Sequence, residues 1–160
     1  MSSENIDRLT DMIAGIDVAM VTSVDADGML HSRPMGTQAV HDERTLYFFT
    51  SAETSLAYQT QENAYVNVSY VDAKRSIYIS ISGIATVLDD REKIAKVWDP
   101  SNSAWFPKGL EDPDLRLLSV EIESAEFWDV ASNALTLLFG YARKAITGKS
   151  DGIGTHERIV

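Results

Sequence analysis

The sequence predicts a mostly β fold, an antiparallel β-barrel of six to seven strands with helices that cover its ends and corners. Short alternating or β-branched runs recur along the chain with turn residues between them, which is typical of such a sheet. The turn sequence DADG at 25–28 joins the first two runs, so that pair is antiparallel and consecutive parallel βαβ units fit poorly. A length of 160 residues suits one domain, which we expect to span 1–148, with a flexible tail over 149–160.

The first half of the chain is predicted to form a helix, three strands and a second helix. Apolar residues at three-to-four spacing predict an amphipathic helix over 5–16. Strands are expected at 17–24, 29–40 and 45–50. The aromatic, β-branched composition of the third strand indicates burial, and the short turn before it leads us to expect that it pairs with the second. A short helix follows at 51–63, with Ser51 or Thr54 as its N-cap.

The second half is predicted to contain further strands and two more helices. Strands are expected at 64–71, 76–88 and 115–124, and residues 125–130 form either another strand or a corner. Gly83 lies inside one of these runs, where a glycine marks a bulge or a bend. The acidic start of 89–98 favours a helix, and a loop rich in aromatics and proline follows at 99–114. A closing helix is expected over 131–146.

Composition and charge argue against several classes of protein. Fourteen Lys and Arg residues against 24 Asp and Glu residues give a net charge of −10, which disfavours nucleic acid or an anionic membrane as a partner. The absence of cysteine excludes disulfides and thiolate chemistry. No apolar run approaches the roughly 20 residues that span a bilayer. The polar N-terminus shows no secretory signal, so we expect a cytoplasmic protein.

No pattern of catalytic or metal-ligating residues is evident in the sequence. His31, His41 and His156 are scattered, HExxH does not occur, and nothing resembles a nucleophile elbow. The grouped carboxylates fall at helix starts, in loops and on strand faces, where a solvated surface is expected. We therefore assign no catalytic residue and no metal site.

Arg33 stands out among the basic residues because it precedes Pro34 inside a β-like run. A proline weakens a strand that is paired on both sides, so this run is either an edge strand with a solvated arginine or a segment that holds a ligand. Pairing with 45–50 would bring Arg33 towards a hydroxyl cluster at a helix start. This cluster consists of Thr50, Ser51, Thr54 and Ser55. A guanidinium, hydroxyls and free helix amides suit a phosphate. In the alternative, the hydroxyls only cap the helix and Arg33 pairs with a carboxylate.

Large aromatic residues gather in the second half of the chain. They are Trp98, Trp105, Phe106 and Trp128. Either the loop that carries Trp105 and Phe106 folds back and buries them, as is usual for large aromatics, or the aromatics form a lid or wall against a flat ring. Periodicity does not decide between these alternatives.

Ordered motifs run through nearly the whole chain, from about residue 5 to about residue 145. They include MLHSRPMGTQ, LYFFTSAETS and the series D-R-x-K-I, W-D-P, W-F-P-x-G, D-P-D-L and W-D. Together these motifs resemble the general stress protein branch of the pyridoxamine 5′-phosphate oxidase-like flavoproteins. The resemblance implies an FMN-binding split barrel that forms a homodimer, with the cofactor at the subunit interface.

The resemblance also implies which residues hold the cofactor. In this family the arginine–proline strand runs beside the flavin, with the arginine at the phosphate. The positions carried over are Ser32, Arg33, Pro34, Met35, Phe49, Thr50, Ser51, Thr54, Ser55, Tyr78, Ser80, Trp105 and Trp128. One departure concerns a lysine that many members carry after the hydroxyl cluster, where this chain has Leu56; Lys74 or Arg75 could compensate for it.

The function implied by the resemblance is that of an FMN flavoprotein that passes electrons from a reduced nicotinamide to a small acceptor. A second hypothesis is a non-catalytic flavin-binding or sensing module active in stress, and a third is a barrel adapted to FAD or a deazaflavin. The sequence leaves open whether the chain turns over. Pyridoxamine 5′-phosphate oxidase activity is disfavoured, because the C-terminal part offers few cations for a substrate phosphate, namely Arg143, Lys144 and Lys149.

Overall fold

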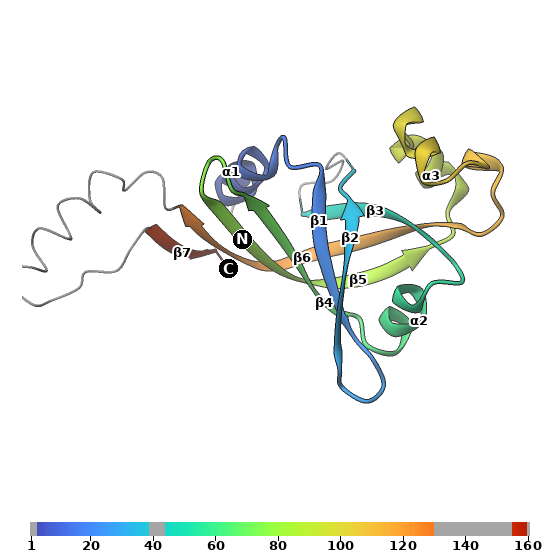
Figure 1. The fold of residues 1–160 in the computed structure, drawn as a ribbon, viewed down its shortest axis with the longest axis horizontal. Coiled ribbons are helices and arrows are strands. Elements are labelled where there is room, and N and C mark those ends of the chain that lie inside the picture. Colours follow the sequence, from blue (N-terminus) through green and yellow to red (C-terminus); the bar gives the residue numbers. More distant parts are fainter. Residues whose placement is uncertain (1–2, 39–43, 130–154, 160) are drawn as a thin grey trace, which may run out of the picture.

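The computed structural model describes residues 3–38, 44–129 and 155–159, which form seven strands, three α-helices and two 3-10 helices (Figure 1). The strands are β1 (Val18–Val24), β2 (Leu30–Gly36), β3 (Thr45–Ser51), β4 (Tyr65–Asp72), β5 (Ile77–Leu88), β6 (Leu115–Asp129) and β7 (Thr155–Ile159). The α-helices are α1 (Ser3–Ile13), α2 (Ser55–Glu62) and α3 (Arg91–Val97). The mostly β prediction and the predicted number of strands are confirmed.

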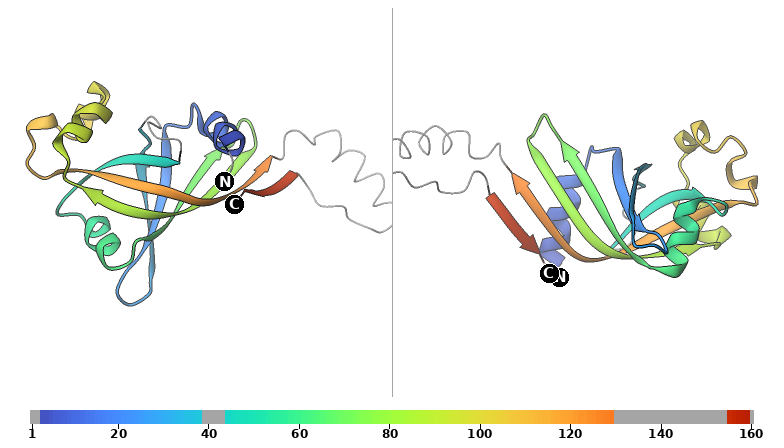
Figure 2. Two further views of the ribbon diagram at one scale, coloured as in Figure 1. Left: turned by 180° about the vertical axis from the view of Figure 1, so that it is seen from behind. Right: turned by 60° about the horizontal axis from the view of Figure 1, so that its bottom comes forward.

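The strands form one antiparallel sheet in the order β2-β1-β4-β5-β6-β3, and β7 pairs with β6 off this path. The sheet curls, so that its first and last strands approach each other (Figure 2). They meet at one isolated bridge, between Thr37 and Phe48, and the sheet is therefore not closed. The predicted barrel is an open, split one in the part of the chain that the structure describes.

The expected pairing of the second and third strands is wrong. β2 pairs along its whole length with β1, where Arg33 lies opposite Val21, and β3 pairs with β6. The reason is burial: residues 46–50 of β3 are all buried, and β6 supplies a partner strand that is equally apolar. β2 is largely exposed and contains Pro34, which has no N–H to donate to a second neighbour. β2 is thus an edge strand over most of its length.

Two hydrophobic clusters form the core. The larger lies on the concave face of the sheet, where side chains of β1, β4, β5 and β6 meet Leu9 and Ile13 of α1 and Leu56 of α2. The smaller lies under α3 and contains Phe49, whose ring makes edge contacts with Trp98 and Phe106 at centroid distances of 5.2 and 6.1 Å. The helices therefore cover the ends of the sheet, as the sequence predicted (Figure 1).

The predicted bulge at Gly83 is confirmed. The register between β5 and β6 shifts between Ser82 and Gly83, at the point where β5 bends. A Cβ atom on Gly83 would lie 2.5 Å from the carbonyl oxygen of Glu121 and 2.7 Å from Cγ1 of Val120. Glycine is required here by close approach of the neighbouring strand, because β6 leaves no room for a side chain.

The C-terminal half differs from the predictions in two places. Residues 115–129 form one continuous strand, β6, so of the two alternatives for 125–130 the strand is found, as an extension of the strand at 115–124 rather than a separate one. Residues 155–159, expected within the flexible tail, form β7, which pairs with the end of β6 from Asp129↔Thr155 to Ala125↔Ile159. On one side of β6, residues 125–129 lie beyond the end of β3, so their backbone groups are free to form hydrogen bonds with β7. The helix expected over 131–146 lies outside the described residues.

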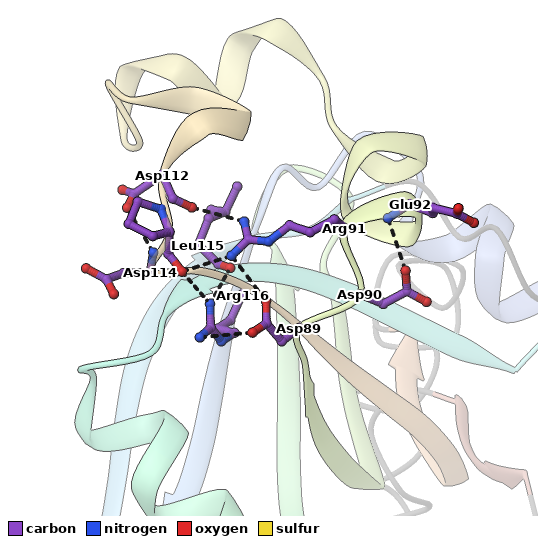
Figure 3. Close-up of polar contacts among 9 residues, drawn as sticks. Asp89, Asp90, Arg91, Glu92, Asp112, Asp114, Leu115 and Arg116 are labelled. Carbon is purple, nitrogen blue, oxygen red and sulfur yellow. Dashed lines mark hydrogen bonds and ion pairs between the residues drawn. The ribbon is translucent and has the colours of Figure 1, made fainter.

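A polar network fixes α3 and the following loop to the sheet (Figure 3). Asp89 forms ion pairs with Arg91 and Arg116, with N–O distances of 3.1 and 3.2 Å. Both arginines also donate to the carbonyl oxygen of Pro113, each over 2.8 Å, and Arg91 donates to that of Asp112 over 3.0 Å. The loop over 99–114, which contains the 3-10 helices Pro100–Ala104 and Gly109–Glu111, is thereby held at its C-terminal end.

We expect Gly83→Ala to destabilise the fold by about 1–3 kcal/mol, because the added methyl group meets backbone that cannot move without breaking the β5–β6 ladder. Urea unfolding followed by circular dichroism measures the effect. Gly36→Ala in β2 is the matched control, since a Cβ atom there lies 3.8 Å from the Gln38 side chain and fits without strain. Equal stability of the two variants would contradict the tight approach of β6 to Gly83.

Candidate functional site

Arg33 occupies a half-buried position on the side of the β1–β2 hairpin that faces α2. Its Nη1 atom donates to Ser23 Oγ over 2.6 Å and, at 3.5 Å, approaches the carbonyl oxygen of Val21. Its Nη2 atom donates to Gln59 Oε1 of α2 over 3.1 Å. The guanidinium therefore bridges β1 and α2, and all of its recorded partners are neutral.

Arg33 keeps its charge in this setting. Burial lowers the pKa of the guanidinium, because a charged group loses hydration there. The side chain nevertheless remains protonated near neutral pH, since a guanidinium is too strong a base to lose its proton there. Among the ion pairs formed by the described residues, none joins Arg33 to a carboxylate. The alternative in which Arg33 pairs with a carboxylate is therefore not found, and the site is suited to an anion.

The start of α2 provides hydroxyls and amides close by in the chain. Thr54 is the N-cap, and its Oγ1 accepts from the Ala57 amide over 3.2 Å and lies 3.0 Å from Thr50 Oγ1. These contacts confirm the capping role predicted for Thr54. The amides of Ser55 and Leu56 have no partner inside the helix, because the first amides of a helix never do. The exposed hydroxyl of Ser55 lies beside them.

Arg33 and the start of α2 face the same side of that helix. Ser55 and Gln59 are separated by four residues, so their side chains lie on one helix face, roughly 5–6 Å apart at Cβ. Since Arg33 binds Gln59, its guanidinium lies about one helical turn from Ser55. The structure thus brings Arg33 to α2, but it contacts Gln59 rather than the hydroxyl cluster at the helix start, and it does so across β1 rather than through pairing of β2 with β3.

Neither Leu56, at the position of the family lysine, nor Arg75, which could compensate for that lysine, lies beside Arg33. Leu56 is buried in the larger core cluster, with 3% of its surface exposed, so a lysine at this position would not project towards Arg33. Arg75 lies in the β4–β5 turn, where it pairs with Asp72 and donates to the carbonyl oxygens of Met12 and Ala14. The compensation expected from Arg75 is therefore wrong, because α1 occupies that guanidinium.

Five other predicted residues lie on the opposite, convex face of the sheet, here called the outer face. They are Ser32, Pro34, Tyr78, Ser80 and Trp128. Ser32 Oγ lies 2.6 Å from Thr22 Oγ1, and Ser80 Oγ accepts from Asn67 over 2.8 Å. The alternation of a strand explains the division, since neighbouring residues such as Ser32 and Arg33 point to opposite faces.

The outer face is unusually apolar for a surface. Its exposed side chains include Val18, Met20, Leu30, Tyr65, Val71 and Tyr78. A groove of about 340 Å³ crosses this face, where Leu30 and Tyr65 form apolar walls and Asn67, Ser82 and Glu123 supply polar groups. Several exposed apolar side chains on one face of a sheet are typical of a surface that contacts another molecule.

The aromatic and apolar residues predicted to contact the cofactor differ in how far the structure buries them. Trp128 stacks on His156 of β7, with ring centroids 4.9 Å apart and planes inclined by 6°. Trp105 is 82% exposed, so the loop does not bury it. Phe49 belongs to the smaller core cluster and Met35 packs against the larger one. The assignment of Phe49 and Met35 to ligand contact is therefore not supported within this chain, because neighbouring side chains already cover them.

Sequence reasoning missed two residues of the site, Ser23 and Gln59. Ser23 is fully buried, and its hydroxyl donates to Gln59 Oε1 over 2.6 Å. The position of Gln59 four residues after Ser55 was the available signal. This spacing alone does not predict a contact between Gln59 and Arg33, because the sequence does not show that α2 packs beside the β1–β2 hairpin.

Two searches of the described residues gave negative results. No group of three or more His, Cys, Asp or Glu side chains within the ranges 3–38, 44–129 and 155–159 could hold a metal ion. No helix in these ranges has the length and apolar character needed to cross a bilayer.

Comparison with known proteins places the chain in a family. The family model for pyridoxamine 5′-phosphate oxidase-like proteins matches residues 4–151. The protein bli-3 of Neurospora crassa is 26% identical over 156 residues, which covers 91% of this chain and 75% of bli-3. General stress protein 26 of Bacillus subtilis is 31% identical over 99 residues, 60% of this chain and 69% of that protein.

A solved structure supports the same assignment. The general stress FMN/FAD binding protein of Xanthomonas citri superposes with a TM-score of 0.67 at 25% identity, over 80% of this chain and 90% of the other. The split sheet and the arginine–proline edge strand are thus set in a fold shared with a flavin-binding relative. The chain belongs to the pyridoxamine 5′-phosphate oxidase-like family, in its general stress protein branch.

Proposed function

We propose that the protein binds FMN, with the flavin phosphate held between Arg33 and the start of α2. The observation that carries this proposal is a half-buried guanidinium whose recorded partners are all neutral, in a chain with a net charge of −10. In so acidic a protein an arginine has many carboxylates available for pairing, and a site that keeps it free favours an external anion. The FMN/FAD binding relative from Xanthomonas citri supports a flavin as that anion.

The residues present fit a phosphate ester. Arg33 supplies a fixed positive charge, Ser55 an exposed hydroxyl, and the first-turn amides of α2 supply donors at the positive end of the helix dipole. Thr50 and Thr54 shape the turn, because they bond to each other and to backbone groups rather than to a ligand. One cation for a dianionic phosphate predicts moderate affinity, so the protein is expected to lose part of its cofactor on purification.

The chemistry follows from the cofactor rather than from acid–base residues. FMN held by Arg33 and the start of α2 would supply hydride chemistry, namely acceptance of a hydride from a reduced nicotinamide and transfer of two electrons to a small acceptor. The role of the chain is to bind the phosphate, to orient the ring and to exclude water. A non-catalytic flavin-binding or sensing module in the stress response, and a preference for FAD, remain competing proposals that share the same binding residues.

We further propose that two copies of the chain pair through the outer face. The exposed apolar side chains of β1, β4 and β5 and the groove among them provide a surface suited to burial against a second copy. Tyr78, Ser80 and Trp128 lie on this face, so a partner subunit would bring them towards a shared cofactor. A stable dimer needs roughly 800 Å² from each subunit, which a sheet face of this size can supply.

The proposal is tested by spectroscopy of the purified protein. Titration with FMN is expected to quench flavin fluorescence and to give a saturable change in the visible spectrum. Addition of NADH or NADPH under exclusion of air is then expected to bleach the bound flavin, and air to restore it. Binding without bleaching would favour the non-catalytic module over the redox protein. Failure to bind any flavin would overturn the proposal.

Arg33→Ala is expected to weaken FMN binding by about 1.5–3 kcal/mol, or roughly ten- to hundredfold in Kd, because a charge-assisted contact to the phosphate is lost. Riboflavin, which has the same ring and no phosphate, should bind both proteins equally. Lys108→Ala removes the same charge from an exposed position in the loop over 99–114 and should change neither affinity. An equal loss for FMN and riboflavin would place Arg33 at the ring instead.

Val71→Lys is expected to produce monomers, because it places a charge among exposed apolar side chains of the outer face, where Val71 is 55% exposed beside Tyr78. Sedimentation velocity distinguishes a monomer from a dimer at micromolar concentration. Leu110→Lys, at an exposed apolar position of the loop over 99–114, is the control and should leave the dimer intact. A wild-type protein that sediments as a monomer at all concentrations would contradict the dimer.

A further inference from the structure

We infer that Gln59 is a positioning residue that holds Arg33 towards the flavin phosphate while leaving its charge uncompensated. The inference rests on the proposed phosphate site and adds a requirement to it. Position 59 must carry a neutral acceptor, because a carboxylate of the same shape would take the place of the ligand. Neither the motifs of the sequence nor the carried-over site residues include this glutamine.

The geometry forms a closed triangle of three side chains from three elements. Arg33 of β2 donates to Ser23 of β1 over 2.6 Å and to Gln59 of α2 over 3.1 Å. Ser23 donates in turn to Gln59 Oε1 over 2.6 Å. Ser23 has one hydroxyl proton, which it donates to Gln59. The lone pairs of its oxygen are therefore free to accept the hydrogen bond from Arg33. Each contact therefore fixes the direction of the other two.

The amide of Gln59 has one permitted orientation. Both groups that face it, the Ser23 hydroxyl and the Arg33 guanidinium, present protons, so the oxygen of the amide must point at them and the NH₂ group must point away. The oxygen accepts twice, from the Ser23 hydroxyl and from Nη2 of Arg33. The Nε–H group and the second proton on Nη2 of Arg33 are used by neither partner, so they are left to bind a ligand.

The choice of an amide over a carboxylate decides the charge of the site. Glutamate at 59 has the same length and could accept the same two hydrogen bonds. It would also form a half-buried ion pair with Arg33 and reduce the local charge from +1 to zero. An incoming phosphate would then meet a neutral pair instead of a free cation, and its binding would have to separate the two. An amide positions the guanidinium without this competition.

The test compares two glutamine-to-glutamate substitutions on one helix. Gln59→Glu and Gln61→Glu add the same charge to α2, but Gln61 is exposed and has no recorded contact with Arg33. FMN and riboflavin are titrated separately into the wild type and both variants. We expect Gln59→Glu to raise the Kd for FMN by about ten- to hundredfold, Gln61→Glu to change it by about twofold or less, and riboflavin affinity to be unchanged in all three.

A second comparison shows whether Gln59 acts through Arg33. In an Arg33→Ala background, Gln59→Glu is expected to weaken FMN binding by much less than in the wild type, because no guanidinium remains to be neutralised and only the repulsion between the new carboxylate and the phosphate is left. Thermal unfolding of Gln59→Glu should match or exceed that of the wild type, since the substituted carboxylate keeps both hydrogen bonds. This result separates loss of binding from loss of the fold.

The outcomes distinguish the two proposals. If the wild type binds FMN more tightly than riboflavin but Gln59→Glu behaves like Gln61→Glu, the role of Gln59 is wrong and the phosphate site stands. An unchanged effect of Gln59→Glu in the Arg33→Ala background also overturns that role. If the wild type does not distinguish FMN from riboflavin, the phosphate site fails, and the role of Gln59 fails with it.

Discussion

A half-buried positive charge held by neutral groups is the constraint around which this structure is organised. Arg33 lies between an edge strand and a helix, and Ser23 and Gln59 accept its hydrogen bonds without cancelling its charge. The arrangement requires β1, β2 and α2 to meet at one place, so the hairpin and the helix are positioned by the same contacts. A carboxylate would satisfy the guanidinium more fully, and its absence is what leaves the site able to bind an anion.

The two faces of the sheet carry different kinds of residue, because successive side chains of a strand point to opposite faces. The concave face carries the core and, at its margin, Arg33; the convex face carries Val71, Tyr78 and other exposed apolar side chains. Tyr70, between two outward residues, shows the contrast: burial raises its pKa to about 12, although its hydroxyl lies 2.9 Å from Thr37 Oγ1. A cofactor whose phosphate is bound at the margin of one face and whose ring meets the other requires a second surface to cover it, which agrees with the proposed pairing of subunits.

Local features of this fold follow from the sequence, whereas the long-range ones do not. The DADG turn, the cap at Thr54 and the bulge at Gly83 each depend on neighbours within a few residues or on one residue type, and each was predicted. Both faces of β3 are buried, so its partner must be a strand that lies inside the fold. The periodicity of the sequence does not show which distant strand that is. Gln59 escaped notice for the same reason, since its role exists only once α2 lies across the hairpin. β7 is a short polar segment whose pairing is set by the free edge of β6.

The partnership of β3 with β6 has a consequence for synthesis of the chain. Thr45 faces Glu121 and Ser51 faces Leu115, so a strand whose five central residues are all buried in the fold waits for a partner made much later. While a ribosome is still extending the nascent chain, β3 can be shielded neither by its ladder nor by the cluster under α3. Pairing over such a separation in sequence is slow, and an unpaired apolar strand aggregates readily. In a protein of this topology, β3 therefore stays without its partner strand until Leu115 has emerged.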